Sequence, residues 1–331
     1  MQASLSPIRV GIVGYGNLGR GVEAAIAKNP DMATAAIYTR RDPAQLQPLG
    51  AGVAVHGLDQ LPGHRDRLDV LILCGGSKDD LPHQSPELAR HFSLVDSFDT
   101  HARIPGHFAA VDAAAQAGRT TALISAGWDP GMFSLNRLMG EALLPDGATY
   151  TFWGKGLSQG HSDAIRRVPG VAGGVQYTIP VPEAVDKVRS GVRPLLSTRE
   201  KHRRECYVVL QAGADAETVR HTIVNMPHYF DEYDTTVHFI SAEELARAHG
   251  AMPHGGFVIR SGNTSARSQQ VIEYRLQLDS NPEFTASVLV AYARAVHRLQ
   301  QAGQHGCKTV FDVPPGLLSP KSAEQLRAEL L

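Results

Sequence analysis

The chain has 331 residues, of which 43% are hydrophobic and 20% are charged, and its formal net charge is -1 at pH 7. This composition is ordinary for a globular protein, and the length is enough for two hydrophobic cores. A net charge so close to zero provides no bulk attraction for nucleic acid or for an anionic membrane, so we expect neither as a partner.

Three cysteines, Cys74, Cys206 and Cys307, lie far apart in the sequence. They have neither the close pairing of a zinc site nor the density of a disulfide framework, so we expect no metal and a reducing, cytoplasmic environment. The first residues contain no basic segment followed by an apolar stretch, and no window approaches about 18 consecutive apolar residues. We therefore expect neither secretion nor membrane insertion.

The first organised segment is a β-branched run at residues 8–13, followed by a glycine-rich turn and a helix-compatible stretch at residues 20–28. The turn reads Gly14-Tyr15-Gly16-Asn17-Leu18-Gly19. In dinucleotide-binding proteins the first glycine makes the tight turn, the second lets the backbone approach the pyrophosphate, and the third allows close helix packing. A glycine turn without a ligand is the alternative. A second strand at residues 34–38 completes a βαβ unit and favours the dinucleotide site.

The end of that second strand indicates which dinucleotide binds. NAD enzymes usually place an acidic side chain there to hold the ribose 2′-hydroxyl, whereas this chain has Thr39-Arg40-Arg41. Two guanidinium groups suit the negative charge of a 2′-phosphate. NADP is therefore the predicted cofactor, although arginine is also common on solvated loops.

Further strand and helix patterns follow, with strands at residues 69–74, 93–99 and 121–126 and a helix at residues 108–117. Ligands of open parallel sheets bind beyond the carboxyl ends of the strands. We therefore expect residues 75–77, 97–99 and 127–130 to converge around the nicotinamide half of the cofactor. Asp99 and Asp129 become candidates for the chemistry, with helix capping or turn formation as the alternative role for each.

Beyond residue 150 the pattern changes to longer alternating runs at residues 206–210, 235–240, 257–260 and 271–278, typical of an antiparallel or mixed sheet. Residues 152–163 are rich in glycine and polar side chains, and we interpret them as a site loop rather than a packed element. An amphipathic helix at residues 284–301 and a strand at residues 309–313 follow. The predicted fold is α/β: a Rossmann-type domain of residues 1–127 and 282–331, and an α+β domain of residues 128–281 with a mixed or antiparallel sheet for substrate binding and dimerisation.

Four segments together resemble the meso-diaminopimelate dehydrogenase family: residues 14–19, 127–134, 153–163 and 252–256. They follow the order of the family and lie in both predicted domains. The resemblance implies a cytoplasmic homodimer of lysine biosynthesis that reversibly converts meso-2,6-diaminopimelate, water and NADP into L-2-amino-6-oxopimelate, ammonium and NADPH. A related reductase, such as dihydrodipicolinate reductase, and a non-catalytic NADP-binding protein are the alternatives.

By motif position, the resemblance also implies the residues of the two binding sites. The implied cofactor contacts are Gly14, Tyr15, Gly16, Asn17, Leu18, Thr39, Arg40, Arg41, Cys74, Gly75, Gly76, Ser77, Ser97, Phe98, Asp99, Ala126, Gly127, Trp128, Asp129 and Pro130. The implied substrate contacts are Asp99, Asp129, Trp153, Gln159, Asp163, Thr178, Arg204, His254 and Asn281. Asp99 and Asp129 are the implied catalytic residues.

The charges of these side chains fit a substrate with two ammonium and two carboxylate groups. Asp99 and Asp129 can accept hydrogen bonds from the reacting amino group, and Arg204, with Thr178 and His254, can bind the distal carboxylate. Asp129 or solvent is the candidate acceptor of the ammonium proton. Without the resemblance, His254 and Trp153 would be interpreted as packing residues and Arg204 as part of a solvated basic face.

Overall fold

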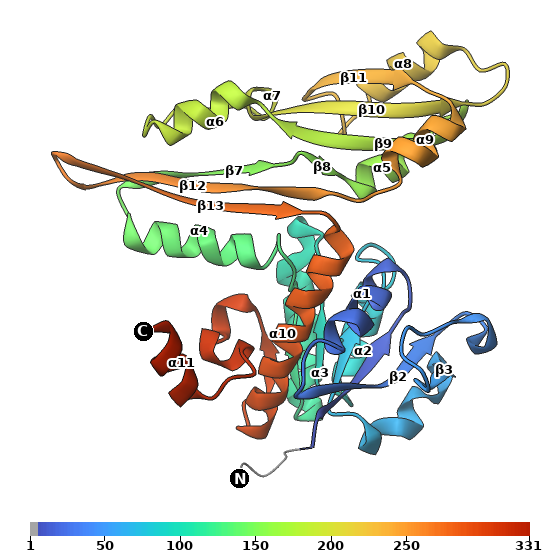
Figure 1. Cartoon of the computed structure of the whole chain (residues 1–331), viewed down its shortest axis with the longest axis vertical. Helices are drawn as coiled ribbons and strands as arrows, with labels where there is room; N and C mark the ends of the chain where they lie inside the picture. Colours follow the sequence, from blue (N-terminus) through green and yellow to red (C-terminus); the bar gives the residue numbers. More distant parts are fainter. Residues whose placement is uncertain (1–5) are drawn as a thin grey trace. The chain divides into compact units, whose positions relative to one another are not determined.

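The structure is a computed structural model that describes residues 6–331, and its elements are drawn in Figure 1. The chain divides into two compact units, one formed by Met1–Leu135 with Pro282–Leu331 and the other by Asn136–Asn281. The first unit contains a parallel sheet, and the second contains one mixed and one antiparallel sheet. The predicted α/β class with a Rossmann-type part and a separate mixed or antiparallel part is confirmed.

The first unit is built on a seven-stranded sheet with the order β14-β6-β5-β4-β1-β2-β3, in which every pair is parallel. Its strands are β1 (Ile8–Val13), β2 (Met32–Thr39), β3 (Val55–Gly57), β4 (Val70–Leu73), β5 (Leu94–Asp96), β6 (Thr121–Leu123) and β14 (Gly306–Lys308). Its helices are α1 (Asn17–Ile26), α2 (Leu81–Ala89), α3 (Ile104–Gly118), α10 (Asn281–Gln301) and α11 (Ala323–Leu330), and α4 (Met132–Leu143) begins in this unit.

Both faces of this sheet are buried, which explains the nearly continuous hydrophobic runs of its strands. Along β4 the side chains alternate between two cores. Val70 and Ile72 contribute to the core that also contains side chains of α1 and α10. Leu71 and Leu73 contribute to the opposite core with side chains of α2 and α3. A period of two residues therefore distributes one strand between two cores.

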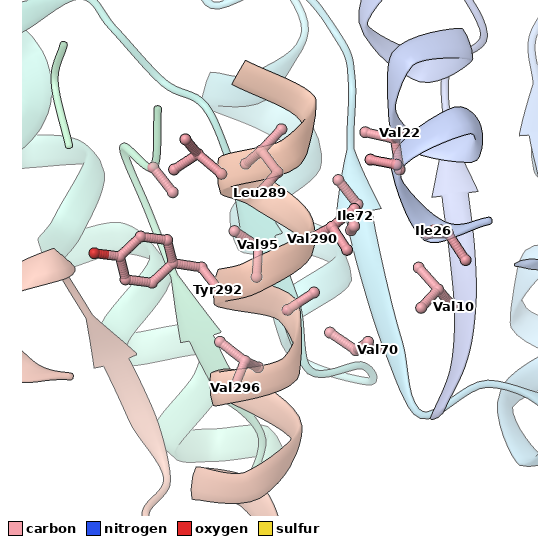
Figure 2. Close-up of a cluster of buried hydrophobic side chains, with 14 of the residues drawn as sticks. Val10, Val22, Ile26, Val70, Ile72, Val95, Leu289, Val290, Tyr292 and Val296 are labelled. Carbon is pink, nitrogen blue, oxygen red and sulfur yellow. The ribbon is translucent and has the colours of Figure 1, made fainter. Parts of the chain in front are cut away.

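Helix α10 brings the C-terminal part of the chain onto the sheet of the first unit. Figure 2 shows Val290 of α10 beside Ile72, and Leu289 and Val296 of the helix belong to the same core. After the helix, β14 pairs with β6 in parallel and becomes the edge of the sheet. The C-terminal residues thus complete a core that the N-terminal residues leave open.

The second unit contains two sheets, with the orders β11-β10-β9-β8 and β13-β12-β7. Its strands are β7 (Gly147–Trp153), β8 (Gly156–Leu157), β9 (Val171–Pro180), β10 (His202–Leu210), β11 (Asp234–Phe239), β12 (His254–Ser265) and β13 (Ser268–Leu278). Its helices are α5 (Gln159–Arg166), α6 (Pro182–Arg189), α7 (Thr198–Lys201), α8 (Ala216–Val224) and α9 (Ala242–His249). The predicted strands at 206–210, 235–240, 257–260 and 271–278 all exist, although β10, β12 and β13 are longer than predicted.

The predicted strand at residues 309–313 is wrong. The strand is β14, Gly306–Lys308, and residues Val310–Asp312 form a short 3-10 helix. The backbone N–H of Thr309 donates to the Asp312 carboxylate at 2.8 Å, and the Thr309 hydroxyl accepts from the N–H of Phe311 at 3.3 Å. These local hydrogen bonds compete with a sheet ladder and turn the chain into a helix.

The prediction that residues 152–163 form an unpacked loop is also wrong in most of its length. Trp153 ends β7, Gly156–Leu157 is β8, and Gln159 begins α5. The glycines permit close packing here: a Cβ on Gly156 would lie 2.4 Å from the His254 ring. Glycine content was thus a sign of close approach rather than of an open loop.

Three predicted strands of the first unit end earlier than the apolar pattern suggests. Strand β4 ends at Leu73, β5 at Asp96 and β6 at Leu123, so the predicted ends at residues 74, 99 and 126 lie in the following loops. Beyond β6, Ser125 has a φ of 58°, in the left-handed region that does not continue a strand. The carboxyl-end loops are therefore longer than expected.

Further 3-10 helices lie at Pro43–Gln45, Leu58–Arg67, His101–Arg103 and Pro315–Leu318.

Across residues 6–331, the helices are all too short or too polar to cross a membrane.

A buried cation ties three segments of the first unit together. Arg294 of α10 is 1% exposed and binds both carboxylate oxygens of Asp31 at 2.6 and 2.7 Å, the Asn29 side chain at 2.6 Å and the Leu318 carbonyl at 2.8 Å. We predict that Arg294→Met lowers the free energy of unfolding by about 3 kcal/mol, because it removes all these hydrogen bonds and leaves the partly buried Asp31 carboxylate without its cation. Urea denaturation measures this.

The matched control is Arg199→Met, which removes an ion pair to Asp234 whose two side chains are 53% and 61% exposed. We expect a loss below about 1 kcal/mol there.

Hydrogen bonds from Arg294 hold the pKa of Asp31 below its usual 3.8. The contribution of the Asp31 pair is therefore complete above pH 4 and is lost as pH falls through the lowered pKa. A difference between wild type and Arg294→Met that did not shrink in acid would contradict this.

Candidate functional site

The glycine turn between β1 and α1 has the backbone geometry that a pyrophosphate site requires. Gly14 has a φ of 91°, which favours glycine, and a Cβ on Gly19 would lie 2.2 Å from the Gly14 carbonyl oxygen. Gly16 has an ordinary φ of -94°, and a Cβ built there would meet no described atom within 4 Å. The first and third glycines are therefore needed by the fold, whereas Gly16 keeps space open.

That open space lies at the N-terminus of a helix. Gly16 caps α1 without a side chain, and no acidic residue stands in the first turn of the helix. The partial positive charge of the helix end is thus not neutralised by a nearby carboxylate of that turn. The turn also follows β1, whose neighbours are β2 and β4, so it lies where the strand order reverses. This is the position at which open parallel sheets bind nucleotides.

Arg41 contacts the glycine turn, and Arg40 directly precedes Arg41 in the sequence. A terminal nitrogen of Arg41 donates to the Tyr15 carbonyl, and the backbone N–H of Arg41 donates to the Thr39 hydroxyl at 3.0 Å. Arg40 pairs with Asp80 at 2.8 Å, and 67% of its side chain is exposed. Arg41 therefore holds the Thr39 to Arg41 segment against the turn. The two guanidinium groups of the segment suit a negatively charged group, such as a 2′-phosphate, better than a neutral ribose hydroxyl.

The loops after β4 and β5 are joined by hydrogen bonds, as the strand pattern predicts. The Ser77 hydroxyl accepts from the backbone N–H of Asp99 at 2.7 Å and lies 3.4 Å from the Thr100 hydroxyl. The backbone N–H of Cys74 donates to the Val13 carbonyl at 2.7 Å. Residues 74–77 and 97–99 therefore meet at the same edge of the sheet as the glycine turn, and Asp99 is exposed there.

Asp96, at the end of β5, organises this edge and was not selected from the sequence. Its carboxylate is fully buried and accepts from the N–H groups of Phe98 at 3.0 Å and Ser125 at 2.9 Å. Its second oxygen accepts from the Ser85 hydroxyl at 2.6 Å and lies 2.8 Å from Nε2 of His107. One carboxylate therefore joins the loops after β5 and β6 to α2 and α3.

Residues 126–130 form a tight turn that leads into α4. The backbone N–H of Ala126 donates to the Asp96 carbonyl at 2.9 Å, and the Gly127 carbonyl accepts from Met132 at 3.0 Å. The Trp128 ring is buried and meets Phe133 edge to face at 5.3 Å. Asp129, the next residue in the chain, is half-buried. The turn thus belongs to the same sheet edge as Asp99.

In the second unit, the structure brings Arg204 and Thr178 together. They are register partners on the antiparallel strands β10 and β9, and a terminal nitrogen of Arg204 donates to the Thr178 hydroxyl. The guanidinium lies 3.9 Å from the centre of the Tyr233 ring and is 5% exposed. Burial lowers the pKa of Arg204. The interpretation of this residue as part of a solvated face is wrong, because alternation along β10 exposes Arg203 and buries Arg204.

Arg204 has no anionic partner in the described part of the chain, since no carboxylate of residues 6–331 forms an ion pair with it. Its Nε is buried without a hydrogen-bond acceptor. A buried cation without a counter-charge is costly unless an anion binds. The arrangement can therefore bind a carboxylate.

Trp153 and His254 lie on neighbouring strands near the same end of their sheet. The backbone N–H of Trp153 donates to Nε2 of His202 at 2.8 Å, and the two rings stack at 5.3 Å. Burial and the nearby Arg204 lower the pKa of His202 to about 3, so its imidazole is neutral. His254 packs against Gly156 and lines a cavity of about 500 Å³ with Pro253 and other residues of β12, β13 and α6.

The remaining predicted substrate residues are more peripheral. Gln159 and Asp163 are exposed on α5, where Asp163 pairs with Arg166 of the same helix. Gln159 lies 3.3 Å from the Met252 sulfur, and the backbone N–H of Asn281 donates to the Met252 carbonyl at 2.9 Å. The main chain at Met252 therefore connects Asn281 with the segment that carries His254.

His161 is a second residue that sequence reasoning did not select. It lies within the predicted 152–163 segment, and its Nε2 is 3.4 Å from a terminal nitrogen of Arg204. Its partner on the other side is the Ser158 hydroxyl, 2.8 Å from Nδ1. The only available signal was a histidine three residues after a helix-capping serine position, which is too common to single out.

Comparison with known proteins agrees with this arrangement. Residues 127–280 match the family model described as the diaminopimelic acid dehydrogenase C-terminal domain. A meso-diaminopimelate D-dehydrogenase of Ureibacillus thermosphaericus is 64% identical over 99% of this chain and 100% of the relative. A multiply substituted meso-diaminopimelate dehydrogenase of Clostridium tetani, solved with DAP, is 53% identical with a TM-score of 0.93, covering 98% and 100% of the two chains. An engineered D-amino acid dehydrogenase bound to NADP+ is 44% identical with a TM-score of 0.86, covering 98% and 100%.

The fold and the sheet-edge site define a Rossmann-type dehydrogenase with a second, mixed α+β unit. Within that class, the chain belongs to the meso-diaminopimelate D-dehydrogenase family, because full-length relatives of that name share up to 64% of its residues. It is an amino-acid dehydrogenase.

The open space at Gly16 generates a prediction. Gly16→Ala places a methyl group in that space at a φ that alanine adopts readily, so the free energy of unfolding should fall by about 1 kcal/mol or less. The same methyl group obstructs close approach of a pyrophosphate, and we expect the Kd for NADP to rise at least about tenfold. Urea denaturation and fluorescence titration measure the two quantities.

Gly19→Ala is the matched control, because its Cβ would overlap the Gly14 carbonyl. There both the free energy of unfolding and NADP binding should decline, the former by about 1–3 kcal/mol. Unchanged NADP affinity in stable Gly16→Ala protein would rule out the glycine turn as the pyrophosphate site.

Proposed function

We propose that this chain catalyses the reversible, NADP-dependent oxidative deamination of meso-2,6-diaminopimelate at its D-configured carbon. The reaction consumes water and gives L-2-amino-6-oxopimelate, ammonium, NADPH and a proton, which places it in lysine biosynthesis. Support comes from the family and from similar chains solved with DAP and with NADP+.

The observation that carries the proposal is the buried guanidinium of Arg204 without an anionic partner among residues 6–331. Diaminopimelate has a carboxylate far from its reacting carbon, and a planar guanidinium binds such a group with directed hydrogen bonds. In the proposal Thr178 and His254 assist Arg204 at this end. Trp153, Gln159, Asp163 and Asn281 complete the proposed substrate contacts.

Asp99 and Asp129 are the proposed acceptors for the reacting D-amino group. Their carboxylates would orient the α-hydrogen and stabilise the iminium cation that forms when the hydride leaves. The ammonium group must first lose a proton, because a protonated amine has no lone pair. Asp129 or solvent would take that proton.

The residues at the sheet edge fit NADP. Gly14 to Leu18 would hold the pyrophosphate at the N-terminus of α1, and Thr39, Arg40 and Arg41 would hold the 2′-phosphate. The remaining proposed contacts are Cys74 to Ser77, Ser97 to Asp99 and Ala126 to Pro130. When bound, NADP+ supplies the hydride acceptor.

We also propose a division of labour between the two parts of the chain. Residues 1–127 and 282–331 would bind NADP, and residues 128–281 would bind the substrate and form a homodimer. A cytoplasmic location is proposed, where the reducing environment suits three unpaired cysteines.

The test is to incubate the purified protein with NADP+ and, separately, with the meso, LL and DD isomers of diaminopimelate, following NADPH absorbance and ammonium release. We expect the highest kcat/KM with the meso isomer and one ammonium per NADPH. The LL isomer has no D-configured carbon, so it should be inactive.

Equal rates with the LL and meso isomers would exclude selection of the D centre. Absence of NADP+ reduction with every isomer would exclude the proposed reaction. Oxidation of NADPH in the presence of dihydrodipicolinate is measured as well. Activity in that assay alone would identify the related reductase instead of the dehydrogenase.

Asp129→Asn tests the catalytic assignment. The amide keeps the size of the side chain but removes its charge and basicity, so we expect kcat to fall by about 100-fold or more. The Kd for NADP should change less than about threefold. Asp234→Asn, which alters an exposed carboxylate paired with Arg199, is the control and should retain wild-type kcat. Near-normal kcat in Asp129→Asn would refute the assignment.

A further inference from the structure

Two protein side chains approach different terminal nitrogens of Arg204 within hydrogen-bonding distance. One is the Thr178 hydroxyl, and the other is Nε2 of His161 at 3.4 Å. The Tyr233 ring covers one face of the guanidinium at 3.9 Å. His161 itself is packed edge to face against Tyr229 at 5.4 Å and Phe230 at 5.7 Å, so its ring has little freedom.

The partners of His161 decide its tautomer. A guanidinium only donates hydrogen bonds, so the Nε2 atom that faces Arg204 must present its lone pair. Nδ1 then carries the proton and donates to the Ser158 hydroxyl at 2.8 Å. Burial and the nearby guanidinium lower the pKa of His161 to about 4, which keeps the imidazole neutral and able to accept.

We propose that His161 is a positioning residue for recognition of the distal carboxylate: the Nε2 lone pair holds one arm of Arg204, and the Ser158 hydroxyl holds the imidazole in the accepting tautomer. This inference rests on the proposed function and adds residues that the substrate contacts did not include. Thr178 and His161 bind different terminal nitrogens of the guanidinium, and the remaining N–H group of each of these nitrogens is left for the ligand.

The physical gain is restriction of a long side chain before the substrate binds. A long arginine side chain loses rotamer entropy when it is immobilised. Two acceptors and an aromatic face hold the Arg204 guanidinium in advance, so less of that cost falls on carboxylate binding. A protonated histidine at this position would instead repel the guanidinium.

The experiment is a double-mutant cycle on the full-length protein, measured with NADP+ and meso-diaminopimelate. His161→Phe keeps an aromatic ring against Tyr229 and Phe230 but removes the acceptor. We expect the KM for meso-diaminopimelate to rise about tenfold, with kcat and the Kd for NADP within about twofold of wild type. In an Arg204→Met background, the same substitution should have no further effect on KM.

Two companion variants sharpen the cycle. His161→Gln restores a side-chain acceptor near the position of Nε2 and should recover most of the KM change. His249→Phe is the matched control: like His161, this histidine lies beside a side-chain hydroxyl, that of Tyr177 at 3.0 Å, and an aromatic ring, that of Tyr207 at 4.1 Å, but it has no hydrogen bond to Arg204. Its KM should stay at the wild-type value.

Each outcome bears on the proposal. An unchanged KM in His161→Phe, or an equal rise in the Arg204→Met background, would overturn the positioning role. If His161→Phe does not fold, Ser158→Ala replaces it, because it releases the Nδ1 proton and should raise KM several-fold; an unchanged KM there would overturn the role as well. Inactivity of the wild type with meso-diaminopimelate would instead overturn the proposed function and this inference with it.

Discussion

The position of β1 between β2 and β4 is the constraint on which the cofactor side of the protein depends. Because both neighbours are parallel to β1, the loops after all these strands emerge at one edge of the sheet. The strand order reverses there, so the loops separate and leave room above the glycine turn. The close approach of Gly19 to Gly14 then fixes α1 against β1 and directs the helix N-terminus to the same edge.

Hydrogen bonds to the Asp96 carboxylate hold the loops at this edge of the sheet in place. It is buried, yet each of its oxygens has two hydrogen-bonding neighbours, so the cost of its desolvation is offset locally. The two backbone N–H groups that donate to it belong to Phe98 and Ser125. Phe98 lies in the loop that carries Asp99, and Ser125 lies in the loop that leads to Asp129. Two exposed or half-buried carboxylates thus stand on a backbone held by a third, buried carboxylate.

Arg204 in the second unit shows the opposite electrostatic situation. It is a buried cation whose protein neighbours are neutral: a hydroxyl, an imidazole and a phenol ring. Such a group is destabilising without an anion, and a strongly perturbed titratable group of this kind is a candidate for a functional site. The neutrality of His161 and His202, both with a lowered pKa, is consistent with a pocket that presents one positive charge.

Local patterns in the sequence determined the glycine turn, the parallel strands and the alternation of the second unit, whereas the candidate substrate residues of that unit came only from the family resemblance. These features depend on neighbouring residues: β-branched runs, glycine spacing and periodicity are local properties. The family resemblance extended them to a substrate. The strand at 309–313 failed because Thr309 and Asp312 form a local cap, which hydrophobic pattern alone does not reveal.

Only the tertiary structure decided which polar side chains are buried and what they meet. Asp96 and Asp99 are three residues apart in Asp-Ser-Phe-Asp, yet one is enclosed by α2, α3 and two loops and the other faces solvent. Arg203 and Arg204 are adjacent, yet only Arg204 lies under Tyr233 and beside His161. Burial depends on segments far away in the sequence, and therefore no local pattern can assign it.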